Sequence, residues 1–359
     1  MEQKAYLVLE NGQVFEGRRF GASGDVTGEL VFTTSMTGYL ETLTDPSYCG
    51  QIVMQTFPLI GNYGVIPSDF ESSNPILSAY IVREWCQEPS NFRNEGTLDT
   101  FLKAHRIIGL YGVDTRELTK IIREQGVMNA RILSDPRADD EMLSALRTYR
   151  VTEAVERASC KEPSIVGSEG AKRRVVLWDF GAKQNISREL AHRGCEVVRV
   201  PADFTAEQIL SYQPDGIMLS NGPGDPADNI GVIEELKKLC VSNLTIFGIC
   251  LGHQLLALAQ GAKTTKLKYG HRGANQPVMD RRTGRLYMSS QNHGYAVESE
   301  TLPSWATERF VNANDNTCEG VDYHNMPAFS VQFHPEACGG PHDTGFLFDQ
   351  FIAMMEEKH

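Results

Sequence analysis

The stretch FGICLGHQLL, residues 247–256, decides the fold, because an apolar strand pattern ends there at a cysteine and a helix pattern begins directly afterwards. Gly248 and Gly252 stand two positions before and two positions after Cys250, where side chains would crowd a sharp turn. A buried cysteine is often only a small hydrophobe. The flanking glycines instead favour the G-x-C-x-G form of a nucleophile elbow. We therefore expect Cys250 to be a nucleophile at the carboxyl end of a parallel strand, beside the positive amino end of a helix.

The segments around the elbow alternate between short apolar runs and amphipathic patterns. Near-continuous apolar strands joined through amphipathic helices are typical of a parallel sheet that is covered on both faces. We therefore expect residues 174–359 to form an open, doubly wound, mostly parallel α/β domain. The expected strands are RVVLWDF, CEVVRV, GIMLSNG and LTIFGIC, and the expected helices are NISRELAHRG, TAEQILSYQ, NIGVIEELKKLC and LGHQLLALAQG.

The first 150 residues have a different pattern, in which several short strands precede two helices. One of these helices is DTRELTKIIREQG, where Asp114 and Glu117 have the spacing of a capping box and Gly126 follows the last turn. We expect residues 1–150 to form a separate mixed α/β domain. Residues 151–173 combine charges, serines and glycines with little periodicity, so we expect a linker there.

Composition limits the classes of function. The chain has 359 residues, enough for two domains, and its formal net charge of -12 argues against nonspecific binding to nucleic acid or to an anionic membrane. It has no signal-peptide pattern and no apolar run that could span a bilayer, so we expect a cytoplasmic protein. Its eight cysteines are scattered without a C-x-x-C pair. We therefore expect free thiols and no metal site.

A cysteine nucleophile requires an imidazole to move protons and a carboxylate to orient that imidazole. His334 ends the apolar strand pattern AFSVQFHPEA, and Glu336 lies two positions further, so both side chains project to the same side of an extended chain. Alone, these two residues would more often form a surface ion pair. Together with the elbow they predict a triad with Cys250, provided that the last strand lies near the elbow strand.

The loop LSNGPGDP, residues 219–226, leaves another strand at the same edge of the predicted sheet. A G-P-G sequence is often a plain β-turn. In the functional interpretation, the amide of Gly222 joins the amide of Leu251 in binding an oxyanion. Both loops would then face one pocket.

These motifs carry a resemblance to a known family. FGICLGHQ, LSNGPGDP and QFHPEA, in this order, resemble the class I (triad) glutamine amidotransferases, and the resemblance covers residues 174–357. The earlier motifs VFTTSMTGYLETLTDPSYCGQIV, FPLIGNYG and SNFRN are similar to the small subunit of carbamoyl phosphate synthetase. The resemblance therefore extends over nearly the whole chain.

The resemblance implies roles for particular residues. Cys250 would be the nucleophile, with His334 and Glu336 completing the triad, and ammonia would be released from glutamine through a γ-glutamyl thioester. The motifs TDPSY, NGPGDP, CLGHQ and QNHGY would contact glutamine. The implied contact residues are Ser47, Gly222, Gly224, Leu251, Gln254, Asn292, Gly294 and Tyr295.

The resemblance also implies a partner, a large synthetase subunit that receives the ammonia in a heterodimer or a higher assembly. The sequence has no G-x-x-x-x-G-K-[ST] loop for ATP, so we expect no cofactor in this chain. ATP, bicarbonate and magnesium are expected on the partner. The carbamoyl phosphate could serve arginine or pyrimidine biosynthesis.

Three alternatives to this function remain at the level of the sequence. The chain could be a stand-alone cysteine hydrolase of γ-glutamyl compounds, which leaves the first 150 residues without a role. It could also be the amidotransferase subunit of another synthase. A noncatalytic interaction module is disfavoured by the presence of all three candidate triad residues.

Overall fold

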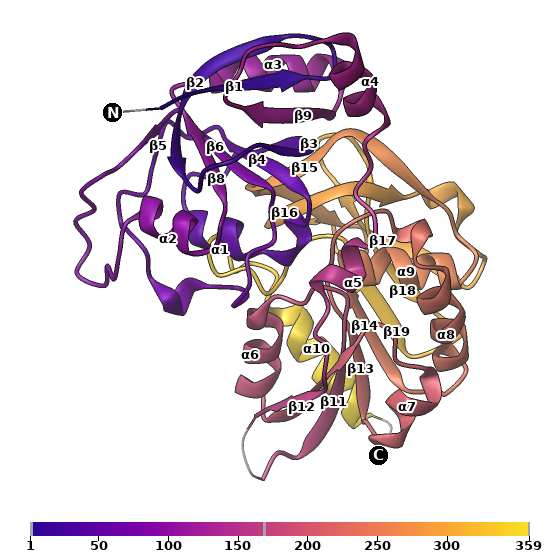
Figure 1. Ribbon diagram of the computed structural model, residues 1–359. Helices are drawn as coiled ribbons and strands as arrows, with labels where there is room; N and C mark the ends of the chain where they lie inside the picture. Colours follow the sequence, from indigo (N-terminus) through magenta and orange to yellow (C-terminus); the bar gives the residue numbers. More distant parts are fainter. Residues whose placement is uncertain (1–2, 168–169, 358–359) are drawn as a thin grey trace. The chain divides into compact units, whose positions relative to one another are not determined.

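The computed structural model describes residues 3–167 and 170–357. Its contacts divide the chain into two compact units, Met1–Thr152 and Glu153–His359. Both units combine helices and strands, as expected from the sequence (Figure 1). Each unit is described below by itself.

The first unit is built around a closed barrel of seven strands in the order β1-β2-β8-β6-β4-β3-β9. The barrel strands are β1 Lys4–Leu9, β2 Val14–Gly21, β3 Val26–Thr33, β4 Gln51–Gln55, β6 Ala79–Val82, β8 Ile108–Tyr111 and β9 Met128–Leu133. The short strands β5 Leu59–Ile60 and β7 Glu84–Trp85 form a separate pair. The helices are α1 Tyr39–Thr44, α2 Leu98–Ala104, α3 Thr115–Gln125 and α4 Asp140–Thr148, with the 3-10 turns η1 Pro46–Tyr48 and η2 Pro67–Asp69.

Local sequence explains the ends of helix α3. The Asp114 side chain accepts the N–H of Glu117 at 2.9 Å, which satisfies a backbone donor that the helix leaves free. Gly126 ends the helix with φ 98°, a conformation that favours glycine. The N-cap bond and the glycine stop expected from the sequence are present, and of the two bonds of a capping box the structure records the one donated by the Glu117 N–H.

The predicted linker, residues 151–173, holds two short elements, helix α5 Ala154–Ala158 and strand β10 Ser164–Val166. β10 pairs antiparallel with the edge of the second unit's sheet, and by contacts the second unit begins at Glu153. All three residues of β10 are exposed. A strand of this length with no buried side gives no periodic signal in the sequence.

The second unit contains a sheet of ten strands in the order β10-β12-β11-β13-β14-β19-β18-β17-β15-β16. Its further strands are β11 Arg173–Asp179, β12 Cys195–Pro201, β13 Gly216–Leu219, β14 Thr245–Ile249, β15 Thr264–Asp280, β16 Arg285–Val297, β17 Ala306–Asn312, β18 Cys318–Tyr323 and β19 Ala328–Val331. The helices are α6 Gln184–His192, α7 Ala206–Ser211, α8 Ile230–Cys240, α9 Leu251–Ala259 and α10 Phe346–Glu356, with the 3-10 turns η3 Pro226–Asp228 and η4 Ser299–Thr301. The four strands and four helices predicted around the elbow are confirmed.

Parallel pairing is confined to the centre of this sheet. The strands β12, β11, β13, β14 and β19 pair in parallel, whereas β18, β17, β15 and β16 extend the sheet with antiparallel pairs. The chain moves from β11 outward to β12 and then returns to β13 on the other side, which creates a topological switch point. This is the doubly wound arrangement expected from the sequence.

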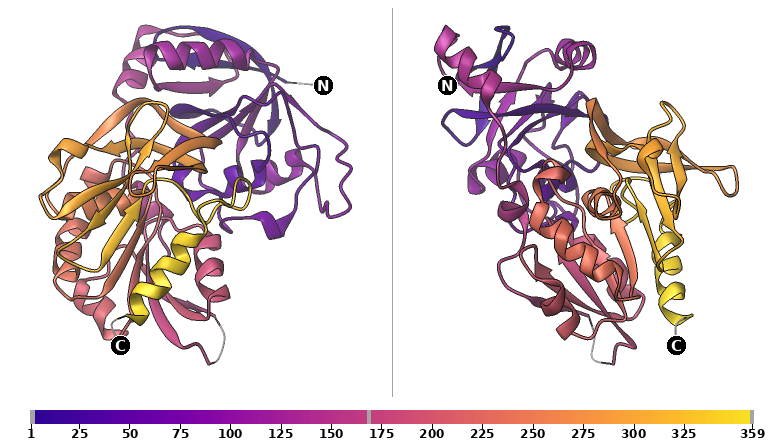
Figure 2. Two further views of the ribbon diagram at one scale, coloured as in Figure 1. Left: turned by 180° about the vertical axis from the view of Figure 1, so that it is seen from behind. Right: turned by 90° about the vertical axis from the view of Figure 1, so that its right-hand side faces the viewer.

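Helices cover both faces of the parallel strands, because alternate residues of each strand point to opposite faces. Val176 and Trp178 of β11 lie in the core with α7, α8 and α9, while Val175 and Leu177 lie in the core with α6 and α10. The side view in Figure 2 shows α10, drawn in yellow, along one face of this sheet. No helix in the described part of the chain has the length and hydropathy needed to cross a bilayer.

The packing of α10 predicts a stability effect. Phe351 is fully buried, and its ring lies 5.9 Å from the ring of Phe247 in β14, the strand that leads to the elbow. We expect Phe351→Ala to lower the free energy of unfolding by about 3–5 kcal/mol, because it leaves a cavity in a close-packed core. Ile230→Ala is the matched control, since this side chain is 68% exposed and its truncation should change stability by less than about 0.5 kcal/mol. Urea unfolding measures the free energy of both variants. Equal losses of stability would contradict the placement of Phe351 in the core.

Candidate active site

The candidate site lies along the carboxyl edge of the parallel strands. β11, β13, β14 and β19 are neighbours that run in the same direction, so their carboxyl ends meet at one edge of the sheet. Open α/β sheets bind ligands at this edge. The segments that follow these four strands carry Lys183, Gly222, Cys250 and His334.

Cys250 occupies the turn between β14 and α9 with φ 53° and ψ -104°. A positive φ is strained for a residue with a side chain and is typical of a nucleophile elbow. A Cβ on Gly252 would lie 2.4 Å from the backbone oxygen of Leu219, and a Cβ on Gly248 would lie 2.8 Å from the backbone of Gly252. Both flanking glycines are therefore sterically required by this turn.

Backbone groups hold Cys250 in place. Its N–H donates to the carbonyl oxygen of Val331 at 2.8 Å, which ties the elbow to β19. Its Sγ lies 3.7 Å from the carbonyl oxygen of Asn292, within reach of a thiol hydrogen bond. The N–H of Leu251 is at the first position of α9, where a helix provides no internal acceptor. A buried sulfur thus sits beside a backbone donor.

His334 and Glu336 form a buried pair directly after β19. Nδ1 of His334 lies 2.7 Å from Oε1 of Glu336, and the two side chains are 1% and 0% exposed. The backbone N–H of His334 donates to the carbonyl oxygen of Ser290 in β16. Nε2 of His334 has no hydrogen-bond partner among the described residues. The carboxylate therefore orients the imidazole through Nδ1, and Nε2 remains available for proton transfer.

Electrostatics link the imidazole to the cysteine. Burial and the Lys183 ammonium lower the pKa of His334, but the Glu336 carboxylate and the Cys250 sulfur outweigh them and hold this pKa above its ordinary value. Burial raises the pKa of Glu336, whereas His334 and Lys183 lower it, and the net pKa of this carboxyl lies below its ordinary value. Both shifts favour an imidazolium next to a carboxylate.

Lys183 was not found by sequence reasoning. Its Nζ lies 3.3 Å from Nδ1 of His334 and 3.4 Å from Oε1 of Glu336, so the ammonium caps the pair. Lys183 stands four residues after the end of β11, in the segment FGAKQN. Since all parallel strands end at the same edge, the polar residues that follow each of them were the signal that could have identified it.

Asp179, the last residue of β11, fixes the segment that carries Lys183. Its fully buried carboxylate accepts the N–H groups of Gly181 and Ala182 at 2.8 and 2.6 Å and of Cys160 at 2.8 Å. The Arg199 guanidinium lies 2.7 Å from the same carboxylate and balances its charge. A buried carboxylate with this many donors is a stable anchor for the turn.

The loop after β13 carries the predicted oxyanion glycine. A Cβ on Gly222 would lie 2.5 Å from the carbonyl oxygen of Phe180, so only glycine fits this close approach. Gly224 has φ 89°, in the left-handed region that favours glycine. The Asn221 side chain accepts the N–H of Lys183 at 3.0 Å, which joins this loop to the turn after β11.

The other predicted glutamine contacts of the second unit belong to α9 and β16. Nε2 of Gln254 donates to the carbonyl oxygen of Tyr295 at 2.9 Å, which holds the QNHGY segment against α9. Asn292 presents its carbonyl to the Cys250 sulfur, and Gly294 lies in the same segment. Ser47 belongs to the first unit, in η1, so its role as a glutamine contact stays a prediction.

Comparisons with known proteins show the family of the chain. Residues 7–132 match the family model of the carbamoyl-phosphate synthase small chain, CPSase domain, and residues 176–354 match that of glutamine amidotransferase class-I. The carbamoyl phosphate synthase small chain of Oceanobacillus iheyensis is 50% identical, covering 99% of this chain and 96% of its own length. That of Fusobacterium nucleatum is 52% identical, covering 98% of both chains. A solved glutamine amidotransferase of Thermotoga maritima shares 18% identity at a TM-score of 0.38, covering 52% of this chain and 85% of its own. The chain therefore belongs to the carbamoyl phosphate synthase small chain family, and its second unit is a class I glutamine amidotransferase domain.

Proposed function

We propose that the chain hydrolyses glutamine with Cys250 as nucleophile, His334 as acid and base, and Glu336 as the group that orients the imidazole. The observation that carries this proposal is the strained elbow at Cys250 beside the buried His334 and Glu336 pair. Nucleophile, base and orienting carboxylate are the three parts that such catalysis requires.

The first step is attack of the Cys250 thiolate on the side-chain amide carbon of glutamine. An S–C bond forms, and the carbonyl oxygen becomes an oxyanion that the amides of Leu251 and Gly222 receive. Loss of one such donor costs about 3 kcal/mol in barrier height. The residues of the second unit that would surround the substrate at this edge of the sheet are Gly222, Gly224, Leu251, Gln254, Asn292, Gly294 and Tyr295.

His334 then moves the protons. The imidazolium donates a proton to the leaving nitrogen as the C–N bond breaks, which releases ammonia and leaves a γ-glutamyl thioester on Cys250. The neutral imidazole next takes a proton from water, which attacks the thioester. Glutamate leaves, the thiolate returns, and His334 is again protonated.

The ammonia needs an acceptor elsewhere, because in water near neutral pH it would become ammonium, which is no nucleophile. We infer a large synthetase subunit as the heterodimer partner, since the curated relatives carry the name small chain. ATP, bicarbonate and magnesium would be used on that subunit, and ammonia would reach it without entering bulk water. This chain would need no cofactor of its own for glutamine hydrolysis.

Replacing the nucleophile tests the division of labour. In the complex with the large subunit, Cys250→Ser should abolish glutamine-dependent carbamoyl phosphate synthesis and leave ammonia-dependent synthesis intact, because only the first requires the thiolate. Loss of both activities would assign Cys250 a structural role instead. Glutamine hydrolysis by the unmodified chain, with and without the partner, also separates the alternatives, since a stand-alone hydrolase should not respond to the partner.

The elbow geometry can be tested without touching a reacting group. Gly252→Ala places a Cβ 2.4 Å from the backbone oxygen of Leu219 and must displace the turn that aims the sulfur. We expect glutamine hydrolysis to fall about 100-fold or more, since a displacement near 1 Å has this cost. Gly231→Ala in α8 is the control, because its Cβ would meet nothing within 4 Å and should leave activity unchanged. Equal activities of the two variants would exclude a steric role for Gly252.

The charges around His334 predict opposite pH shifts in two variants. Glu336→Gln removes a group that raises the pKa of His334, so this pKa should fall and the alkaline limb of kcat/KM should move to lower pH. Lys183→Met removes a group that lowers the same pKa, so the limb should move to higher pH. Histidine NMR titration checks the assignment directly. Shifts in the same direction would contradict the proposed electrostatics.

A further inference from the structure

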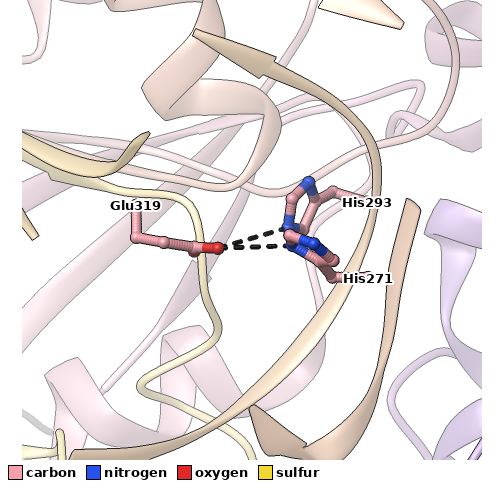
Figure 3. A group of neighbouring side chains, drawn as sticks. All are labelled: His271, His293 and Glu319. Carbon is pink, nitrogen blue, oxygen red and sulfur yellow. Dashed lines mark ion pairs between the residues drawn. The ribbon is translucent and has the colours of Figure 1, made fainter. Parts of the chain in front are cut away.

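A second cluster of polar side chains lies on the antiparallel strands β15, β16 and β18. His271, His293 and Glu319 are buried, and one donor atom from each lies within 4.8 Å of the other two (Figure 3). Oε1 of Glu319 lies 3.4 Å from Nδ1 of His271 and 3.9 Å from Nε2 of His293. The catalytic scheme above uses none of these three side chains.

Hydrogen bonding determines which ring nitrogen of His293 faces the cluster. Its Nδ1 lies 2.8 Å from the carbonyl oxygen of Tyr295, so the N–H of a neutral ring is used there. Nε2 then faces two acceptors, Oε1 of Gln291 at 3.2 Å and Oε1 of Glu319 at 3.9 Å. The oxygen and nitrogen of the Gln291 amide cannot be exchanged. Its Nε2 donates to Ser289 Oγ, and the Ser289 hydroxyl proton is already donated to the carbonyl oxygen of Gln276. In the neutral ring, Nε2 therefore carries a lone pair that faces two oxygens, neither of which donates a proton to it.

Hydrogen bonds also orient His271 and Glu319. Nε2 of His271 lies 2.8 Å from Oδ2 of Asp315, which leaves Nδ1 turned toward Glu319 and toward Nδ2 of Asn312, 3.5 Å away. Glu319 is fully buried. Its Oε1 accepts a hydrogen bond from Asn312 at 3.1 Å, and its Oε2 has no partner among the described residues. A buried carboxylate with one oxygen unpartnered is incompletely compensated, and a cation bound to this carboxylate would lower that cost.

We propose that His271, His293 and Glu319 bind a divalent transition-metal ion of the Zn²⁺ type. Two imidazoles and one carboxylate form a known zinc ligand set, and the Gln291 oxygen is placed to serve as a further ligand. Asp315 and the Tyr295 carbonyl hold the outer nitrogens of the two rings, as groups around metal-binding histidines usually do. Metal–ligand distances of about 2.1 Å place ligand atoms about 3.4 Å apart, so small side-chain rotations suffice.

This site gave no signal in the sequence, from which we expected no metal. Its ligands stand at positions 271, 293 and 319, on three different strands, so no short spacing connects them. A proton on either ring would also compensate the Glu319 charge. The two explanations differ in a measurable quantity, which is the amount of metal bound by the folded chain.

The test uses the full chain with Cys250→Ser, which removes the candidate catalytic thiol as a competing metal ligand. After equilibration with Co²⁺ and removal of loosely bound ions, we expect one Co²⁺ for each chain. Its visible absorption should be that of a nitrogen and oxygen site, without a thiolate-to-cobalt charge-transfer band. Competition with Zn²⁺ should remove the cobalt spectrum. Absence of retained metal, or a thiolate band alone, would overturn the proposal.

Variants locate the ion. In the same background, His293→Ala should abolish cobalt retention, and Asp315→Asn should weaken affinity about 10- to 100-fold through the orientation of His271. The second variant keeps the test valid if the first fails to fold. His324→Ala is the control, because this ring bonds Thr307 and is not in the cluster. Cobalt binding that is unchanged in Asp315→Asn, or in folded His293→Ala, would place the ion elsewhere and refute the assignment.

Discussion

The backbone of Cys250 is the constraint on which the rest of the site depends. A residue with φ 53° and ψ -104° costs about 1–3 kcal/mol, and it persists only where the surrounding structure determines it. Gly248 and Gly252 permit the turn by lacking side chains, and the bond from the Cys250 N–H to Val331 fixes it against the neighbouring strand. That same strand, β19, leads directly to His334. The turn therefore determines where the sulfur lies and ties it to the strand that leads to His334. The backbone strain and the catalytic geometry thus have a common origin.

Charge compensation is the second requirement, because the groups on this edge are buried. Lys183, His334 and Glu336 form a compact set in which an ammonium and an imidazole share one carboxylate. Removing Glu336 would leave the ammonium and the imidazolium without their shared carboxylate, and an uncompensated buried charge costs more than the pair itself contributes. The ammonium and the carboxylate act on the imidazole in opposite directions, and the sulfur tips the balance toward the imidazolium. Asp179 completes this arrangement from a distance, since its carboxylate holds the turn on which Lys183 stands.

Local patterns in the sequence were enough to predict the parallel half of the sheet and the candidate triad. Cys250 is framed by glycines in the same turn, and His334 and Glu336 end one strand, so each signal lies within a few residues. Lys183 contacts residues about 150 positions away in the sequence, and no local pattern reports such a contact. The same reason applies to the closure of the seven-stranded barrel, to the antiparallel strands β15 to β18 and to the cluster at Glu319. Those features depend on pairing between distant segments, which periodicity does not encode.

Strand β16 connects the two polar sites of the second unit through its pleat. Successive side chains of a strand point to opposite faces, so Gln291 and His293 share one face and Asn292 and Gly294 belong to the other. The first pair contributes to the cluster with Glu319, while the backbone of Asn292 contacts the Cys250 sulfur. The Tyr295 carbonyl accepts bonds from both His293 and Gln254, one from each site. Because the cluster residues Gln291 and His293 flank Asn292 in one strand, we expect a change in the geometry of the buried cluster to alter the backbone beside the nucleophile.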